Sequence, residues 1–427
     1  MCTGAQSTAG VRSIPQVRIA IPARVPRMSG VRSGKMVPMA SYGTDPARAR
    51  VPFRHVATWG PLLPAALGVL GIVVATVAAP AEARSAAAQV YGPFVLVAGL
   101  LLIGLVADGD GLFAAVGQRL SARAPNGAVL FLGAAVTTAL VTAVLNLDTA
   151  VVFVTPVLVH ACRGRGVGAT PFVVACLLLA NAGSLPLPGA NLTNLIVLGH
   201  LHLTGSQFLH HMALPWLVAV VVTAAVIGIA ERRTLRETAA PATDRVPVVV
   251  GVGLAAVAVA ALLVLVLRSP AVPVAVVGLA AVGWRLRSGS TGSVAVRRVL
   301  GVPVLIGLFG ISVALGTLGR SWSGPSTLLS HLGPAGTTVA AALASVLVNN
   351  LPAAALLAAR TPPHPFALLI GLDVGPNLFI TGSLAWVLWW RTVTGTGAEP
   401  PTRRAIVLGL ISAPLAMAAA LVVLGPG

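Results

Sequence analysis

The chain has 427 residues, of which 56% are hydrophobic and only 9% are charged. Soluble domains carry roughly 25% charged residues, so the composition excludes an ordinary soluble protein and indicates an integral membrane protein. The formal net charge of +18 is strongly basic, and its distribution along the chain is informative about topology.

Residues 1–55 are predicted to form a disordered basic arm. They contain nine Lys or Arg residues against the single Asp45, are rich in Pro, Ser and Gly, and show no apolar periodicity. Such an arm can adhere to anionic lipid. The simpler interpretations, which we favour, are an inert tail or a translation start at a later methionine, Met28, Met36 or Met39.

Nine apolar runs are predicted to cross the membrane as helices, because each approaches or exceeds the ~20 residues that span the hydrocarbon core. They cover residues 59–79, 90–107, 169–202, 212–230, 246–267, 271–285, 299–318, 366–391 and 405–424. The first run is too long for a signal-peptide core and lacks a convincing cleavage site, so we expect it to be retained.

Two further segments, 127–161 and 336–360, are too long for one crossing and short for two, and each is polar near its middle. Lys and Arg in short loops mark the cytoplasmic side. If each segment enters and leaves on one side and the amino terminus is cytoplasmic, nearly all basic residues face the cytoplasm. The exceptions are Arg84, Arg268, Arg320 and Arg360. An arm of only about 20 Å for residues 149–161 then favours a re-entrant hairpin.

The same order of elements occurs twice, which predicts two repeats. Residues 56–230 form repeat 1 with hairpin 127–161, residues 231–268 form a cytoplasmic linker and connector helix, and residues 269–427 form repeat 2 with hairpin 336–360. Repeat 1 and the connector make an odd number of crossings, so the second repeat is inverted. Inverted repeats with interrupted helices are a recurring plan of secondary transporters.

Four polar interruptions are expected to meet near the membrane midplane, two at the hairpin tips and two where Gly and Pro break the spans at 181–194 and 373–383. An ionised Asp at a helix centre costs ~2.5–3.5 kcal/mol on insertion scales, so Asp148 and Asp373 are candidates for coupling a proton or ion. Alternatively, Asp148 caps the returning helix, and Asp373 lies nearer an interface.

Amide and hydroxyl side chains at the four interruptions are the candidate substrate-binding groups. They are Asn146, Thr149, Asn191, Thr193, Asn194, Asn349, Asn350, Asn377, Thr381 and Ser383. The alternative role is helix capping and interhelical hydrogen bonding, each worth about 1 kcal/mol.

We expect no metal site and no cofactor. The histidines at 200, 202, 210 and 211 are interpreted as interfacial, and the three cysteines, Cys2, Cys162 and Cys176, have no paired ligand spacing. Neither a phosphate-binding GxxxxGK[ST] motif nor an HExxH motif occurs. Transport by this chain would therefore be secondary, and we expect neither an enzyme activity nor a nucleic-acid partner.

Four stretches together resemble the arsenite permease branch of the ion transporter superfamily, which also contains the sodium-coupled divalent anion symporters. They are NLDTAVVFVTPVLVH, LANAGSLPLPGANLTNLIV, VLVNNLPAAALL and IGLDVGPNLFITGSLAWVLWWR. The resemblance extends from about residue 59 onward. It implies an all-helical, elevator-type carrier with two re-entrant hairpins and two broken helices. The resemblance also implies that the carrier is a homodimer and lies in the cell membrane. For the arsenite branch it also implies efflux of arsenite or antimonite driven by the proton gradient, sometimes with an ATPase partner.

The substrate prediction rests on charge. Hairpin 1 reads Asn146-Leu147-Asp148-Thr149 where the divalent anion symporters have a Ser-Asn-Thr signature, and no Lys or Arg lies at any of the four interruptions. An ionised Asp148 would repel a dicarboxylate. A neutral trihydroxide such as As(OH)₃ needs only uncharged donors and acceptors. The alternatives are a sodium- or proton-coupled carrier of dicarboxylate-like, citrate-like or inorganic anions and, in another class, a membrane scaffold that does not transport.

Overall fold

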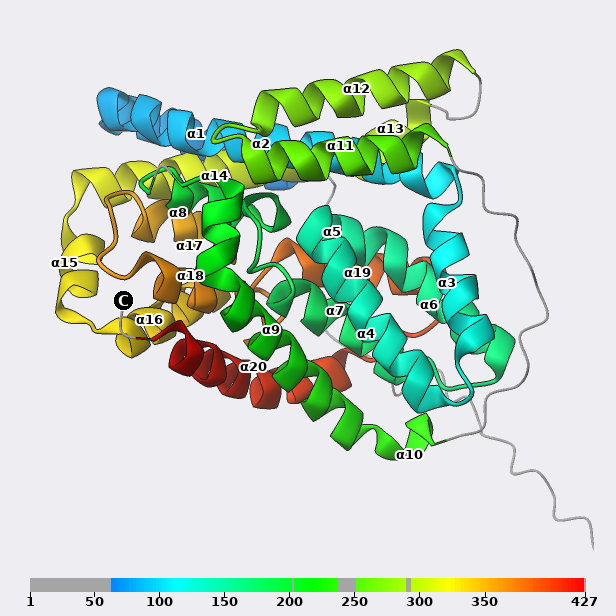
Figure 1. The fold of residues 1–427 in the computed structure, drawn as a ribbon. Coiled ribbons are helices and arrows are strands. Elements are labelled where there is room, and N and C mark those ends of the chain that lie inside the picture. The colour runs from blue at the N-terminus through cyan, green and yellow to red at the C-terminus, as the bar shows by residue number, and fades with distance from the viewer. Residues whose placement is uncertain (1–62, 202, 237–250, 289–292, 426–427) are drawn as a thin grey trace, which may run out of the picture. The chain divides into compact units, whose positions relative to one another are not determined.

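A computed structural model describes residues 63–201, 203–236, 251–288 and 293–425. The predicted arm 1–55 lies outside this part of the chain. Within it, the regular structure is helical and no strand occurs (Figure 1). The first helices are α1 (Leu63–Ala78), α2 (Pro80–Gly109), α3 (Leu112–Arg123), α4 (Gly127–Val144), α5 (Leu147–Thr149), α6 (Thr155–Arg165), α7 (Thr170–Ala182), α8 (Leu192–Leu198), α9 (Gly205–Ala230) and α10 (Arg232–Leu235). The others are α11 (Val252–Val266), α12 (Ala271–Arg287), α13 (Ser293–Leu300), α14 (Val302–Ser321), α15 (Gly324–His331), α16 (Pro334–Val348), α17 (Asn350–Leu357), α18 (Pro365–Val374), α19 (Leu384–Gly395) and α20 (Thr402–Leu424).

Six helical runs in the described residues are long and apolar enough to cross a membrane. They are Pro80–Gly109, Gly127–Val144, Leu147–Arg165, Gly205–Ala230, Ala295–Ser321 and Thr402–Leu424. Many of their apolar side chains face outward, as in Leu132 of α4 and Leu214 of α9, which are 63% and 53% exposed. Such a surface requires lipid around it, so the protein is a multi-pass membrane protein.

Several helix bounds differ from the prediction. The expected loop before residue 90 is helical, because α2 begins at Pro80, where proline suits a first helical turn. The span expected from residue 212 begins at Gly205, after a capping box formed by Thr204 and Gln207. The short helices α3 and α15 were not predicted, because neither has a long apolar run to reveal it.

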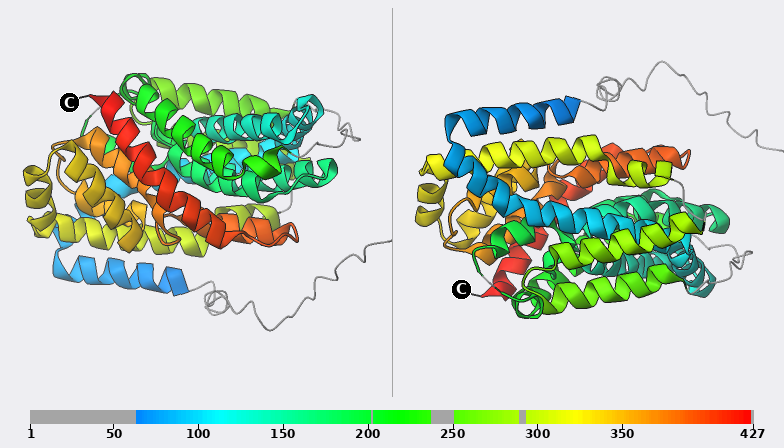
Figure 2. Two further views of the ribbon diagram at one scale, coloured as in Figure 1. Left: turned by 90° about the horizontal axis from the view of Figure 1, so that it is seen from below. Right: turned by 90° about the horizontal axis from the view of Figure 1, so that it is seen from above.

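Two pairs of helices cross at glycines. Figure 2 shows α1 beside α14, and α2 between α14 and α12. At the α1–α14 crossing, a Cβ on Gly310 would lie only 2.0 Å from the Gly68 carbonyl oxygen. At the α2–α12 crossing, a Cβ on Gly278 would lie 2.6 Å from the Gly99 oxygen. Small residues at these points allow the backbones of membrane helices to approach closely.

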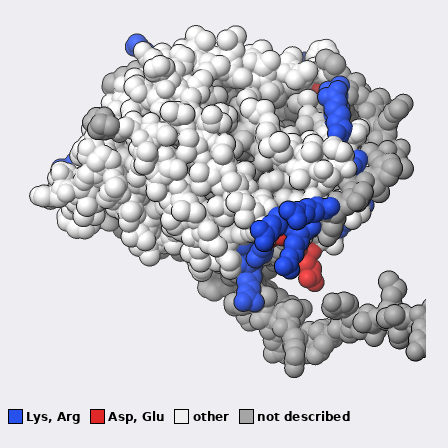
Figure 3. Space-filling view, turned by 60° about the horizontal axis from the view of Figure 1, so that its bottom comes forward, with Lys and Arg blue, Asp and Glu red and all other residues white. Residues whose placement is uncertain are grey.

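Arginines gather where the end of α9 meets the start of α20, and Figure 3 shows a group of basic residues together on one face of the molecule. The Arg404 guanidinium pairs with Glu231 at 2.5 Å and thereby ties the start of α20 to the end of α9. Exposed arginines in this region are Arg232, Arg233, Arg236 and Arg403. A second ion pair, between Arg285 and Asp110, joins α12 to the residue that follows α2, and Asp110 Oδ2 also accepts from the backbone N–H of Gly253 at 2.6 Å.

The two hairpin segments differ in length. In the first, α4 is followed by a continuous helical arm from Leu147 to Arg165, which includes a π-helical turn, Ala150–Val154. This arm has 19 residues and rises about 28 Å. It is longer than the predicted 149–161, so its length gives no reason to prefer re-entry. In the second, α17 has only 8 residues, about 12 Å, which is too short to cross a bilayer.

Candidate functional site

The tip of the first hairpin is capped by Asn146, not by Asp148. Asn146 Oδ1 accepts from the backbone N–H of Thr149 at 2.6 Å and begins the helix. Asp148 lies within the first turn, and its buried Oδ1 has no hydrogen-bond partner among the described residues. The interpretation of Asp148 as the helix cap is therefore wrong. Its carboxyl group is free of that structural task.

Two further polar atoms at this tip are buried and have no hydrogen-bond partner among the residues that the structure describes. They are Asn146 Nδ2 and Thr149 Oγ1, and the π-helical turn follows directly. Turns of this kind occur most often at functional sites, because they displace side chains from the regular helical register. Buried polar groups without partners are costly, so this tip has unused capacity to bind a polar ligand or water.

The tip of the second hairpin is built around a strained residue. Asn349 has φ +77°, the positive value that among the described residues is otherwise found at glycines. Its Oδ1 accepts from Leu351 N at 3.4 Å, and its Nδ2 donates to the Thr381 carbonyl oxygen at 3.4 Å. Asn350 N donates to Gly382 O at 2.8 Å. The tip is thus attached to the break between α18 and α19.

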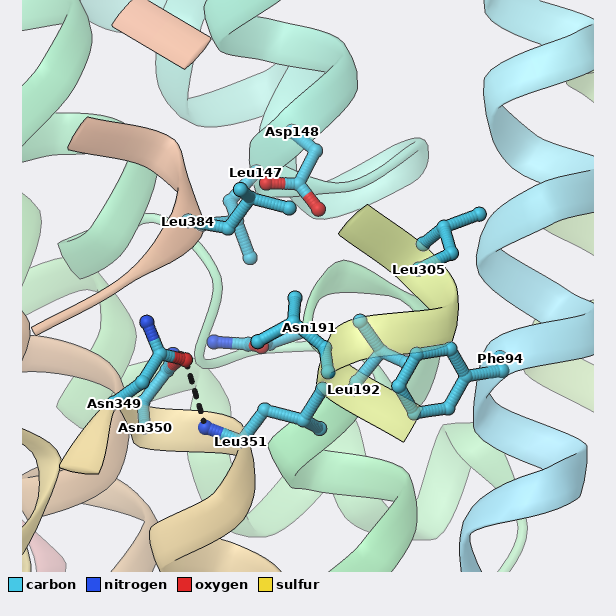
Figure 4. Close-up of a pocket in the computed structure, with 11 residues that line it drawn as sticks. Phe94, Leu147, Asp148, Asn191, Leu192, Leu305, Asn349, Asn350, Leu351 and Leu384 are labelled. Carbon is cyan, nitrogen blue, oxygen red and sulfur yellow. Dashed lines mark hydrogen bonds between the residues drawn. The ribbon is translucent and has the colours of Figure 1, made fainter. Parts of the chain in front are cut away.

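A cavity of about 20 Å³ lies between these tips. Figure 4 shows Asp148 on one side, Asn349 and Asn350 across from it, and Asn191 between them. The other residues that line it are apolar: Phe94, Leu147, Leu192, Leu305, Leu308, Leu351 and Leu384. The volume is sufficient for about one water molecule. No Lys or Arg is among the described residues that line it.

A second polar cluster lies at the breaks of the two interrupted helices. Asp373 Oδ1 accepts from Thr193 Oγ1 at 2.5 Å and from Asn191 Nδ2 at 3.0 Å. Asn191 Nδ2 also donates to Ser184 Oγ at 3.2 Å. Asp373 is fully buried and does not line the cavity. Asn191 belongs to both places and connects the cluster with the cavity.

The breaks also hold each other in place. Asn181 Nδ2 donates to Asn377 Oδ1 at 2.9 Å, and Asn377 Nδ2 donates to the Leu178 carbonyl oxygen at 2.9 Å. Asn194 Nδ2 closes its own loop by donating to the carbonyl oxygens of Ser184 and Leu187 at 2.8 and 2.9 Å. These amides satisfy backbone groups that the helix breaks leave open.

The structure divides the predicted site residues into three sets. Those that line the cavity are Asp148, Asn191, Asn349 and Asn350. Those that hold the breaks or tips are Asn146, Thr193, Asn194, Asn377, Thr381 and Asp373. Thr149 and Ser383 are buried, and their hydroxyls have no partner within the described part of the chain.

Sequence reasoning did not include Asn181 and Ser184 among the site residues, although both lie in the quoted motif. Their Asn and Ser residue types inside an apolar run were the available signal. The apolar lining residues, such as Phe94 and Leu305, gave no signal, because neither residue type is unusual in a membrane span.

Comparisons with known proteins give a consistent family. A sequence model of the citrate transporter family (CitMHS) matches residues 56–371. The arsenical pump membrane protein of Escherichia coli is 24% identical over 336 residues, which cover 69% of this chain and 77% of that protein. A solved structure, the YdaH transporter of Alcanivorax borkumensis, aligns with a TM-score of 0.49 and 14% identity, and covers 85% of this chain and 97% of that one. Because the matched segment is well over half of its length, the chain belongs to the citrate transporter family.

Proposed function

We propose that this chain is a proton-coupled exporter of neutral metalloid hydroxides such as arsenite and antimonite. The observation that supports the proposal is the lining of the cavity: its described residues include one carboxyl group and three amide side chains, and no Lys or Arg is among them. Asp148 is the proposed proton carrier. Asn191, Asn349 and Asn350 are the proposed substrate-binding groups, because amide groups form hydrogen bonds with hydroxyls.

The coupling step follows from the position of Asp148. Asp148 lines the cavity, and its buried Oδ1 has no partner in the described structure. As a carboxylate, Asp148 can accept hydrogen bonds from the O–H groups of a neutral trihydroxide, whereas a bound proton neutralises the group and occupies one of these acceptor positions. Proton binding and substrate binding would then compete for one side chain, which is the requirement for exchange of the two.

The second candidate is proton- or sodium-coupled transport of citrate-like anions. The match to the citrate transporter family favours it, and the 24% identity to the arsenical pump membrane protein favours the first candidate. The charge of the cavity argues against this second candidate. A tricarboxylate would lie beside Asp148, and no Arg or Lys is among the described lining residues to offset the repulsion.

Substrate entry requires movement. The cavity of about 20 Å³ is too small for a metalloid trihydroxide or for citrate. Its walls come from the hairpin tips and breaks on one side and from Phe94 of α2 and Leu305 of α14 on the other. We propose that these two sides separate in an elevator-type movement. In an exchanged pairing, the first predicted span of each repeat packs against the second predicted span of the other repeat: α1 against α14, and α12 against α2. This arrangement supports the inverted repeat on which that mechanism depends.

Transport into everted membrane vesicles tests the proposal. The substrates are arsenite, antimonite, citrate, succinate and sulfate, each with and without a pH gradient and with and without sodium. We expect accumulation of arsenite and antimonite that needs the pH gradient and not sodium. Accumulation of citrate alone would replace the first candidate by the second. Vesicles that move none of these compounds would favour the scaffold.

Topology is tested by single cysteines in a background without Cys2, Cys162 and Cys176. We expect Gly164→Cys to be labelled from the cytoplasm and Ser206→Cys from outside, because the broken span between them crosses the membrane. Both positions are open: nothing lies within 4 Å of a Cβ at Gly164, and Ser206 is exposed. Gly205 is unsuitable, since its Cβ would lie 2.1 Å from Val264 O. Labelling of both from one side would rule out the inverted repeat.

A further inference from the structure

Asp373 lies behind the cavity and reaches it only through a neighbour. Its Oδ1 accepts from Thr193 Oγ1 and Asn191 Nδ2 at 2.5 and 3.0 Å. Of these three residues, Asn191 alone lines the cavity. Any effect of Asp373 on a bound substrate therefore passes through the amide group of Asn191.

The hydrogen bonds of Asn191 leave it a single role toward the cavity. An amide has two N–H donors and one oxygen with two lone pairs. Both N–H groups are used, one by Asp373 Oδ1 and one by Ser184 Oγ at 3.2 Å. Within the described ranges of the chain, the oxygen accepts only from Thr193 N, at 3.4 Å. Asn191 thus offers the cavity an acceptor and no donor.

The protonation state of Asp373 does not change this arrangement. Asp373 Oδ2 is buried without a partner in the described part of the chain. A proton on Oδ2 would leave Oδ1 free to accept both bonds. A flipped Asn191 amide would instead place two acceptor oxygens, Asn191 Oδ1 and Asp373 Oδ1, against each other and lose both donations. The amide therefore keeps its orientation in either state.

We infer that Asp373 is a positioning residue that makes the cavity select substrates carrying an O–H group. Asp373 fixes the amide of Asn191 so that Asn191 Oδ1 is the atom available to the cavity. This oxygen accepts a hydrogen bond from a hydroxyl and repels an ionised carboxylate oxygen. A site built to hydrogen-bond a substrate O–H rejects an analogue that lacks it, because the site group is left unpaired. This inference rests on the proposed function in one respect, that the cavity is the substrate site.

The test uses the full-length protein in proteoliposomes and a matched pair of probes, arsenite and dimethylarsinous acid, in which methyl groups replace two of the three hydroxyls of arsenite. If the wild-type protein moves citrate and not arsenite, citrate and tricarballylate, which is citrate without its hydroxyl, replace this pair. Asp373→Asn is unsuitable here, because its amide oxygen can take the place of Oδ1, as in the acid protonated on Oδ2. For Asp373→Ala, which removes the acceptor that fixes the Asn191 amide, we expect the ratio of kcat/KM between the two probes of a pair, with the probe that has more hydroxyls in the numerator, to fall at least about tenfold. The KM for arsenite should rise, and accumulation should still follow the pH gradient. Ser184→Ala frees one N–H of Asn191 and should shift the ratio in the same direction by less. The matched control Thr193→Ser keeps the hydroxyl that binds Asp373 and should keep the ratio.

An unchanged ratio in Asp373→Ala would overturn the inference, as would loss of the pH-gradient dependence without a change in the ratio, which would make Asp373 a coupling group. If Asp373→Ala does not fold, the ratio measured for Ser184→Ala decides. A wild-type protein that moves citrate but not arsenite would refute the proposed substrate alone. The citrate-to-tricarballylate ratio would then still decide the role of Asp373.

Discussion

Asp148→Asn should abolish accumulation of arsenite against a gradient while leaving the protein folded and slow downhill exchange intact. Asn has nearly the shape of Asp but cannot release a proton. The helix start does not depend on residue 148, since Asn146 supplies the cap. Uptake driven by a pH gradient in everted vesicles, compared with counterflow in the absence of a gradient, separates loss of coupling from loss of binding.

Asp373→Asn is the matched control for Asp148→Asn, because Asp373 is also a buried carboxyl group but does not line the cavity. We expect it to retain accumulation driven by the pH gradient. If Asp148→Asn accumulates arsenite with the wild-type pH dependence, the proton takes another route, and Asp373 becomes the first group to examine.

Gly310→Ala should destabilise the protein by about 3 kcal/mol, because its Cβ would lie 2.0 Å from the Gly68 carbonyl oxygen and both partners are backbone. The helices α1 and α14 would have to separate along their whole contact. Gly283→Ala in α12 is the control, since nothing lies within 4 Å of a Cβ there. We expect it to be stabilising by about 0.5–1 kcal/mol, as alanine favours helix.

Thermal unfolding of both glycine variants in detergent provides the measurement. A clear loss of apparent melting temperature for Gly310→Ala, with none for Gly283→Ala, is the expected result. Equal melting temperatures would show that α1 does not pack against α14 as closely as described, and would remove support for the exchanged pairing of the repeats.

The helix breaks could be predicted from the sequence because local chemistry determines them. Gly and Pro in the stretches 183–190 and 375–382 cannot continue a helix without cost, and Asn191 is a favourable residue at a helix start. The bounds that were missed depend on weaker signals. Residues 80–89 are helical although they are not continuously apolar, and α3 is a short helix that ends in Arg123.

The division of the site residues could not be predicted. The sequence made both Asp148 and Asp373 candidates for coupling, because both are carboxyl groups in apolar segments. Their difference arises from partners distant in the chain: Asp373 is bound by Thr193, from the other half of the protein, whereas Asp148 Oδ1 is not bound within the described residues. Similarly, the sequence predicted that Thr381 binds substrate. In the structure its hydroxyl donates to Val346 O at 2.5 Å and supports the hairpin tip.

The most direct test of proton-coupled export is the movement of protons caused by substrate. Proteoliposomes are loaded with arsenite and a pH-sensitive dye, the membrane potential is clamped with potassium and valinomycin, and the vesicles are diluted into arsenite-free buffer without sodium. We expect the lumen to acidify as arsenite leaves, and we expect no acidification in vesicles with Asp148→Asn. Arsenite efflux from wild-type vesicles with no change in luminal pH would contradict proton-coupled export.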